Sequence, residues 1–246
     1  MKERSIWIGF DPREASAFAV CRHSLQRHLT QHIPVKGLVL DTLQRRGLYT
    51  RPMEYRSSVA EKPVMWDVIS DAPMSTQHAN ARFLVPHLAK RGWALFCDGD
   101  MLFRSNVARL FDLLDDRKAV YCVKHDYTPK HDRKMDGQRQ TVYSHKNWSS
   151  FIIFNCDHEA NKDLTPEMVN TLPGRDLHRL CWLDRIGGDG SLIGGLDPAW
   201  NFLVGHSDES IEPKCVHFTE GVPDMRGYED VIYADEWREE LARWAA

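Results

Sequence analysis

The chain lacks several features that would direct the search for a function elsewhere. Among its 246 residues there is no hydrophobic run long enough to cross a membrane, and the apolar stretch at residues 6–10 is too short for a signal peptide. The formal net charge of −3 gives no general attraction to nucleic acid or to anionic lipid. No repeat, low-complexity tract or Gly/Ser-rich linker divides the sequence. We therefore expect a single domain spanning residues 1–246, with no nucleic-acid partner and no transmembrane segment.

Cysteine is present, but not in a pattern typical of zinc sites or disulfide frameworks. The six cysteines are scattered and include no CxxC pair. Four of them lie in or beside apolar runs, where buried free thiols usually occur: Cys97, Cys122, Cys156 and Cys215. This usage is typical of a reducing compartment and predicts a cytoplasmic protein.

Apolar runs typical of buried strands alternate with segments of helical periodicity. We expect strands at residues 6–10, 35–40, 119–123, 151–154 and 214–218, and helices at residues 13–29, 77–90, 107–114 and 234–244. Residues 41–73 are polar and irregular, and we expect loops with short helical pieces there. The alternation predicts an α/β fold with a mainly parallel central sheet flanked by helices.

The most informative motif follows one further apolar run. Within residues 93–103, a strand-like segment ends in Asp98-Gly99-Asp100. Side chains two residues apart in an extended chain point the same way, so both carboxylates leave the strand end on one face. Gly99 allows a ligand to approach the main chain between them. Asp and Gly are also common turn formers, but the preceding strand favours a divalent cation at the edge where open α/β sheets bind ligands.

Two other side chains are candidates for the same site. His217 ends another apolar run, and an imidazole beside two carboxylates makes a donor set that suits Mn²⁺ better than Mg²⁺. A single histidine on its own is more often structural or exposed. Arg82 lies on the helix expected before the aspartates, where it either contacts an anion or remains a solvated arginine.

Residues 124–147 form a polar segment that is long for a loop in a compact domain. Such loops usually carry a function. We expect this one to contact an acceptor or to fold over a donor, and its basic side chains suit an anionic group: Lys124, Lys130, Arg133 and Lys134.

Four segments together resemble the retaining, nucleotide-sugar-dependent glycosyltransferases of the GT-A fold. The closest likeness is to glycosyltransferase family 8, the galactosyltransferase and glycogenin type. The segments stand in the family's order, at residues 6–11, 81–86 with 95–100, 149–155, and 196–201 with 217–221. Each is weak alone, whereas the ordered set spans nearly the whole chain and is fairly specific. The resemblance implies a single GT-A (Rossmann-like) domain.

The resemblance also implies an activity. A hexose would pass from a nucleoside-diphosphate sugar, such as a UDP-sugar, to a hydroxyl group of a saccharide or other acceptor, with retention of configuration and with Mn²⁺ (or Mg²⁺) as cofactor. The implied metal ligands are Asp98, Asp100 and His217, and the implied nucleotide-binding positions are Gly9, Asp11 and Gly99.

The implied contacts with the sugar and the diphosphate come from other segments. Arg82 would lie near the donor sugar or the diphosphate, and Asp126 and Asp189 would face the sugar. These three are the candidate catalytic residues. Gly221 would lie against the diphosphate.

The chain departs from the family pattern in two places. Asp224 stands where the family usually has a lysine that holds the diphosphate, and Arg226 is the nearest cation. The Asn-Ala-Gly triplet of the family is replaced by Trp148-Ser149-Ser150.

Two other functions stay open. A haloacid-dehalogenase-like phosphatase also uses Asp-x-Asp after a strand, but it expects the motif on an early strand with Thr or Val two residues later, whereas Met101 and Leu102 follow here. A non-catalytic nucleotide-sugar-binding protein on the same scaffold is compatible with the missing lysine.

Overall fold

A six-stranded sheet forms the centre of the computed structural model, which describes all residues except 1, 57–62, 127–144, 146 and 188–189. Its strand order is β10-β8-β9-β6-β1-β2. The strands are β1 (Arg4–Gly9), β2 (Val35–Leu38), β6 (Trp93–Cys97), β8 (Val120–Cys122), β9 (Phe151–Asn155) and β10 (Ile193–Gly195). Only β9 runs antiparallel to its two neighbours among these strands. The predicted α/β fold with a mainly parallel sheet is thus confirmed.

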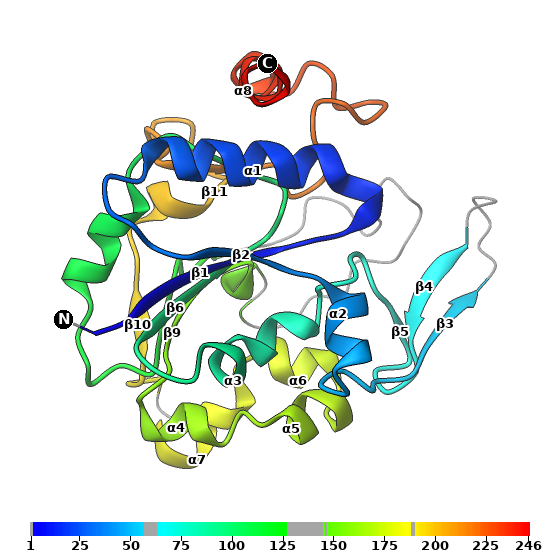
Figure 1. Cartoon of the computed structure of the whole chain (residues 1–246), viewed down its shortest axis with the longest axis vertical. Helices are drawn as coiled ribbons and strands as arrows, with labels where there is room; N and C mark the ends of the chain where they lie inside the picture. Colours follow the sequence, from blue (N-terminus) through cyan, green and yellow to red (C-terminus); the bar gives the residue numbers. More distant parts are fainter. Residues whose placement is uncertain (1, 57–62, 127–144, 146, 188–189) are drawn as a thin grey trace.

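Helices cover both faces of this sheet (Figure 1). On one face lies α1 (Ala15–His28), with α8 (Ala234–Ala245) beyond it. The opposite face carries α2 (Leu40–Arg45), α3 (Val85–Ala89), α4 (Glu159–Lys162), α5 (Pro166–Thr171), α6 (Gly174–His178) and α7 (Asp184–Gly187). The short 3₁₀ helices are η1 (Pro12–Glu14), η2 (Ala81–Leu84), η3 (Val107–Leu113), η4 (Trp148–Ser150), η5 (Cys181–Leu183) and η6 (Pro198–Asn201).

Alternate side chains of each strand enter different cores, as the pleat of a strand requires. Ile6 and Ile8 pack with Leu25 of α1, whereas Trp7 packs with Phe83 and the other residues of the opposite face. The cysteine prediction is confirmed, because the four thiols named above are free and buried.

A second, three-stranded sheet lies on the α1 side and was not expected as such. It consists of β7 (Met101–Phe103), β12 (Cys215–His217) and β11 (Phe202–Leu203). β7 directly follows the two aspartates and pairs antiparallel with β12, so that His217 lies opposite Met101. This pairing brings the end of the chain's last strand to the aspartate turn.

The expectation of loops with short helical pieces at residues 41–73 is confirmed up to residue 52, but strands that were not expected lie in the later part of that segment. Beyond α2, it contains an antiparallel sheet of β3 (Met53–Arg56), β4 (Val64–Asp67) and β5 (Ala72–Pro73), which extends to one side in Figure 1. A buried ion pair anchors this sheet, because Arg51 Nε donates to Asp67 Oδ1 at 2.8 Å and Arg51 Nη1 to the Val169 carbonyl at 2.8 Å. Such long-range bonds leave no periodic signal in the sequence.

The prediction of a single continuous helix at residues 77–90 is also wrong. Residues 77–80 form turns, and two short helices follow, η2 and then α3. Pro86 occupies the first turn of α3. Because proline has no amide hydrogen to bond a preceding turn, it begins a helix more readily than it continues one.

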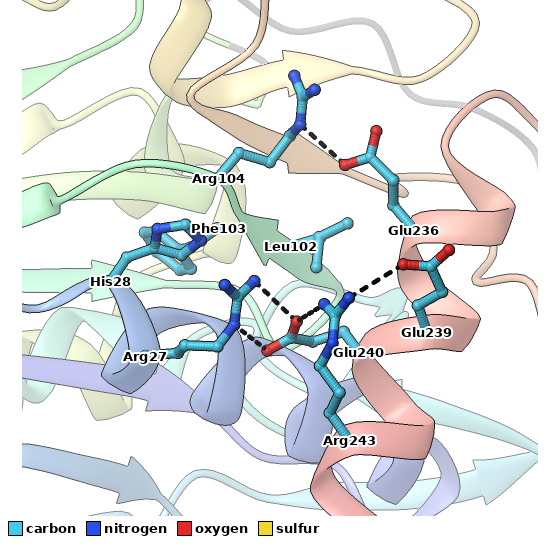
Figure 2. A pocket seen from close by; sticks show the side chains of 9 residues that line it. All are labelled: Arg27, His28, Leu102, Phe103, Arg104, Glu236, Glu239, Glu240 and Arg243. Carbon is cyan, nitrogen blue, oxygen red and sulfur yellow. Dashed lines mark hydrogen bonds and ion pairs between the residues drawn. The ribbon is translucent and has the colours of Figure 1, made fainter.

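The terminal helix α8 is attached to α1 through one buried carboxylate. Glu240 is 1% exposed and accepts from Arg27 Nη2 at 2.9 Å and from Arg243 Nη1 at 3.2 Å. Figure 2 shows these groups around a hollow between α1, β7 and α8. Trp237, which is 1% exposed, packs in the apolar cluster beneath the helix.

Candidate functional site

Three predicted metal ligands meet where β6 and β12 end. One ligand atom each from Asp98, Asp100 and His217 lies within 4.8 Å of the others. The aspartates occupy the turn between β6 and β7, and the antiparallel pairing of β7 with β12 places the histidine beside them. The side chains of Asp98 and Asp100 are 16% and 21% exposed, so the group opens to solvent on the carboxylate side.

Asp98 is ionised and held by two groups from the segment before β6. Arg82 Nη2 lies 2.8 Å from Asp98 Oδ1, and His78 Nε2 lies 3.2 Å from the same oxygen. Burial favours the protonated form of this carboxyl, but Arg82 and His78 outweigh it and hold the pKa of Asp98 well below its ordinary value. The carboxylate is therefore charged across the physiological pH range.

Asp100 and His217 form the other half of the group. His217 Nε2 lies 3.3 Å from Asp100 Oδ1, an oxygen that is buried and accepts no aligned hydrogen bond from the described residues. Burial alone lowers the pKa of His217, but Asp100 and then Asp98 raise it above its ordinary value. A buried oxygen without a donor, next to an imidazole and a second carboxylate, fits a divalent cation.

Close backbone packing explains the two glycines of the site. A Cβ on Gly99 would lie 2.5 Å from the Gly9 carbonyl oxygen at the end of β1. A Cβ on Gly9 would lie 2.5 Å from the ring of His78. Both distances are shorter than van der Waals contact, so Gly99 lets the aspartate turn pack against the end of β1, and Gly9 leaves room for the His78 ring.

Arg82 is a fixed part of the site and not a solvated surface residue. It is 5% exposed, and its Nε and Nη1 donate to the carbonyls of Ala79 and Ser149, each at 2.9 Å. Ser149 Oγ lies 2.7 Å from His178 Nδ1. Burial and then Arg82 lower the pKa of His178 to about 3, which keeps this histidine neutral. The guanidinium is thus positioned without any ligand.

The structure gives Asp11 a bracing role at the carboxyl end of β1. Its two oxygens accept from Arg13 N and Nε at 2.9 Å, from Arg13 Nη2 at 2.6 Å and from Gln77 N at 2.9 Å. The residue is 2% exposed. Through these bonds, the carboxylate joins η1, which precedes α1, to the segment that carries His78 and Arg82.

The remaining predicted residues have fewer contacts with Asp98, Asp100 and His217, the three residues called the metal group below. Asp126 is exposed, and Asp189 lies outside the described residues, as does most of the segment 124–147. The Gly221 amide closes a turn with the Phe218 carbonyl at 3.0 Å, and Phe218 N in turn donates to the Asp100 carbonyl at 3.0 Å. Arg226, five residues after Gly221, is exposed. Asp224 accepts a hydrogen bond from Ser16 of α1.

Sequence reasoning missed two titratable groups near the site. Glu14, which is half-buried, has its pKa raised to about 8 by burial, by Asp100 and by Asp11, against the opposing effect of Arg13. His125 follows β8, and burial and the neighbouring His217 lower its pKa to about 4. Neither lies in a recognisable motif, although Glu14 comes five residues after the end of β1 and His125 three residues after the end of β8.

No helix among the described residues is both long enough and apolar enough to cross a membrane.

No family model matches the chain. The comparison with solved structures reveals a shared fold at low sequence identity. The bifunctional glycosyltransferase WbbM superposes with a TM-score of 0.61 at 16% identity, covering 98% of this chain and 50% of that one. The glycosyltransferase GlyE of Streptococcus pneumoniae gives 0.59 at 13% identity, covering 99% and 61%. The galactosyltransferase LgtC gives 0.58 at 13% identity, covering 97% and 95%.

This chain therefore spans half of the WbbM chain and less than two thirds of the GlyE chain. The likeness shows that the chain has a glycosyltransferase fold of the GT-A type.

The comparison with curated protein sequences finds a relative with much higher sequence identity. Protein CDI of Arabidopsis thaliana is 39% identical over 245 residues, which cover 97% of this chain and 86% of that protein. The chain thus belongs to the family of Protein CDI.

Proposed function

We propose that this protein is a metal-dependent retaining glycosyltransferase, similar to family 8, that transfers a hexose from a UDP-sugar to a hydroxyl acceptor. The observation that carries the proposal is the convergence of Asp98, Asp100 and His217 at the ligand-binding edge of a GT-A sheet. In open α/β sheets, ligands bind at the carboxyl ends of the strands, where this group lies.

Mn²⁺ is the proposed cofactor. Two carboxylates and one imidazole form a mixed oxygen and nitrogen donor set, which favours Mn²⁺ over Mg²⁺. When bound, the ion supplies Lewis-acid stabilisation of the charge that develops on a departing diphosphate. A diphosphate leaves readily with that help, so the reaction needs no carboxylic acid of the kind that glycosidases use.

The chain's own cations complete the proposed diphosphate site. The buried Arg82 guanidinium lies against Asp98 and is fixed by two carbonyls, so we place it beside the diphosphate as a fixed positive charge. Arg226 is exposed on the loop after β12, and we assign to it the role of the lysine that the family has near this point. We also place the diphosphate beside Gly221, on the same loop.

Contacts with the nucleotide and the sugars come from the neighbouring strand ends. We place the nucleobase near Gly9 and Asp11 at the carboxyl end of β1, where hydrogen bonds within the chain already occupy the Asp11 carboxylate. Asp126 and Asp189 are proposed to orient the donor sugar, and the segment 124–147 to contact the acceptor. No nucleophile is assigned, because a front-face reaction that retains configuration forms no covalent intermediate.

The chain as a whole is proposed to act as one catalytic domain in the cytoplasm. The free, mostly buried thiols of the described residues support a reducing compartment.

Thermal-shift screening of nucleotide sugars, with and without Mn²⁺, tests the proposal. A UDP-sugar with Mn²⁺ at about 100 times its Kd should stabilise the folded chain by about 2.7 kcal/mol. The same sugar in excess EDTA should have a much smaller effect. Stabilisation by no nucleotide sugar in either condition would contradict the proposed donor class.

Turnover distinguishes an enzyme from a binding protein on the same scaffold. Ser16 donates a hydrogen bond to Asp224 and so fixes an acidic side chain where the family has a lysine. This observation favours a non-catalytic nucleotide-sugar-binding protein. We expect slow Mn²⁺-dependent release of UDP from the donor that binds best. Stoichiometric binding without any UDP release would support the non-catalytic function, and phosphate release from simple phosphoesters would support the phosphatase.

A further inference from the structure

A buried asparagine contacts His217 at Nδ1, the ring nitrogen that faces away from the two carboxylates. Asn201 ends η6 and is 0% exposed. Its Oδ1 lies 2.9 Å from His217 Nδ1. On the other side of the amide, Nδ2 lies 2.9 Å from Ser150 Oγ and 3.3 Å from the Asn147 carbonyl oxygen.

The hydrogen-bond partners fix the orientation of this amide. The Asn147 carbonyl can only accept a hydrogen bond, and Ser150 Oγ uses its own proton to donate to that carbonyl at 2.7 Å. Both groups therefore present lone pairs to Asn201, and the amide nitrogen must face them. The amide oxygen then faces His217 Nδ1, which must carry a proton to satisfy the contact.

The protonation of Nδ1 determines the state of the opposite ring nitrogen. In a neutral imidazole with its proton on Nδ1, Nε2 holds a lone pair. That lone pair faces Asp100 Oδ1 across 3.3 Å. Two acceptors that face each other repel, and a cation between or beside them, either a proton or a metal ion, relieves this repulsion.

We infer that Asn201 is a positioning residue that holds His217 in the Nδ1-protonated tautomer, with Nε2 available to a divalent cation. The inference rests on the proposed metal site. Partners of this kind behind a ligating histidine fix its tautomer and its ring orientation, and removing them weakens metal binding.

Ser150 links this support to the other half of the metal group. Its carbonyl accepts from Asp98 N at 2.9 Å, and its hydroxyl accepts from Asn201. The end of η4 therefore sets the position of one ligand just after β6 and, through Asn201, of another on β12. Serine at this position, where the resembled family has glycine, supplies the hydroxyl that the arrangement uses.

Titration with Mn²⁺ alone, followed by electron paramagnetic resonance of the free ion, tests the inference. We expect Asn201→Ala to weaken Mn²⁺ binding roughly 10- to 100-fold, the usual effect of losing such a partner. Ser150→Ala should weaken it less, because the Asn147 carbonyl still accepts from the amide.

Asn161→Ala is the matched control. Asn161 is 4% exposed, and its Nδ2 bridges the carbonyls of Ala119 and Asn155 at 2.7 and 2.9 Å, away from the metal group. It should lose stability as Asn201→Ala does, yet keep the Mn²⁺ affinity of the unmodified protein. Equal Mn²⁺ affinity in the unmodified protein, Asn201→Ala and Asn161→Ala would overturn the role of Asn201 while leaving the metal site intact. Failure of the unmodified protein to bind Mn²⁺ would overturn the metal site itself.

A second measurement needs no variant and no metal. Long-range ¹H–¹⁵N correlation spectra of the metal-free protein, at a pH where His217 is neutral, report which ring nitrogen carries the proton. We expect Nδ1 to be protonated and Nε2 to be unprotonated. A proton on Nε2, or rapid exchange between the two tautomers, would overturn the inference even if Asn201→Ala does not fold.

Discussion

Replacement of Glu14 by glutamine should stabilise the metal-free protein at pH 8 and leave its stability at pH 5 almost unchanged. The pKa of Glu14 is raised from 4.5 to about 8, first by burial and then by Asp100 and Asp11. The folded state therefore binds this proton more tightly than the unfolded chain does. The stability that the proton provides is fully present below pH 4.5 and declines as the pH rises towards 8.

The raised pKa also sets the size of the effect. A shift of this size corresponds to a loss on the order of 4–5 kcal/mol once the carboxyl is ionised. Glu14 is only half-buried, so solvent screening reduces the loss, and we expect about 2–3 kcal/mol at pH 8. Glutamine has nearly the same shape as glutamate and is neutral at every pH. The free energy of unfolding of Glu14→Gln should therefore not fall as the pH rises from 5 to 8.

Urea unfolding at pH 5 and pH 8, in the presence of EDTA, measures this difference. Glu209→Gln, at an exposed position, is the control and should have little effect at either pH. An equal gain at both pH values, or a loss of stability at pH 8, would refute the assigned environment of Glu14. Addition of Mn²⁺ at pH 8 should reduce the advantage of the variant, because a nearby cation favours the ionised carboxyl of the unmodified protein.

Three further substitutions probe the site and its support. Asp100→Asn should abolish Mn²⁺-dependent donor hydrolysis while leaving the melting temperature nearly unchanged; full activity of this variant in excess EDTA would refute the metal role. Gly99→Ala should lower stability by about 1–3 kcal/mol, because its Cβ would meet a main-chain oxygen at 2.5 Å, whereas Gly195→Ala, with no atom within 4 Å of its Cβ, should have no such effect. Glu240→Gln should cost about 1–2 kcal/mol at pH 7, since this buried carboxylate accepts charged hydrogen bonds from Arg27 and its neighbours. The pKa of Glu240 lies below its ordinary 4.5, so this difference between the two proteins should fade as the pH falls below that value, and a difference that stays constant down to pH 3 would contradict the ion pairs.

The positions of the aspartates could be predicted because they depend on local rules. An apolar run ends at Asp98, and the i, i+2 spacing places Asp100 on the same face of an extended chain. His217 could be proposed as a third ligand because it also ends an apolar run. Its place beside the aspartates results from the pairing of β7 with β12, two strands of three residues each. Strands this short carry no readable period.

The hydrogen bonds that support the ligands could not be predicted, because they join residues that are far apart in the sequence. Asn201 contacts Ser150, which lies 51 residues away, and Arg82 donates to a carbonyl 67 residues away. The family resemblance implied that Asp11 contacts the nucleotide. Its actual hydrogen bonds to Gln77 depend on how a later segment folds back over β1.

Anomalous diffraction from crystals grown with Mn²⁺ and UDP tests the central claim most directly. We predict one manganese peak between the carboxylates of Asp98 and Asp100, in contact with His217 Nε2 and with the diphosphate of the nucleotide. A peak elsewhere, or a nucleotide bound at this edge of the sheet with no manganese beside these three side chains, would contradict the account.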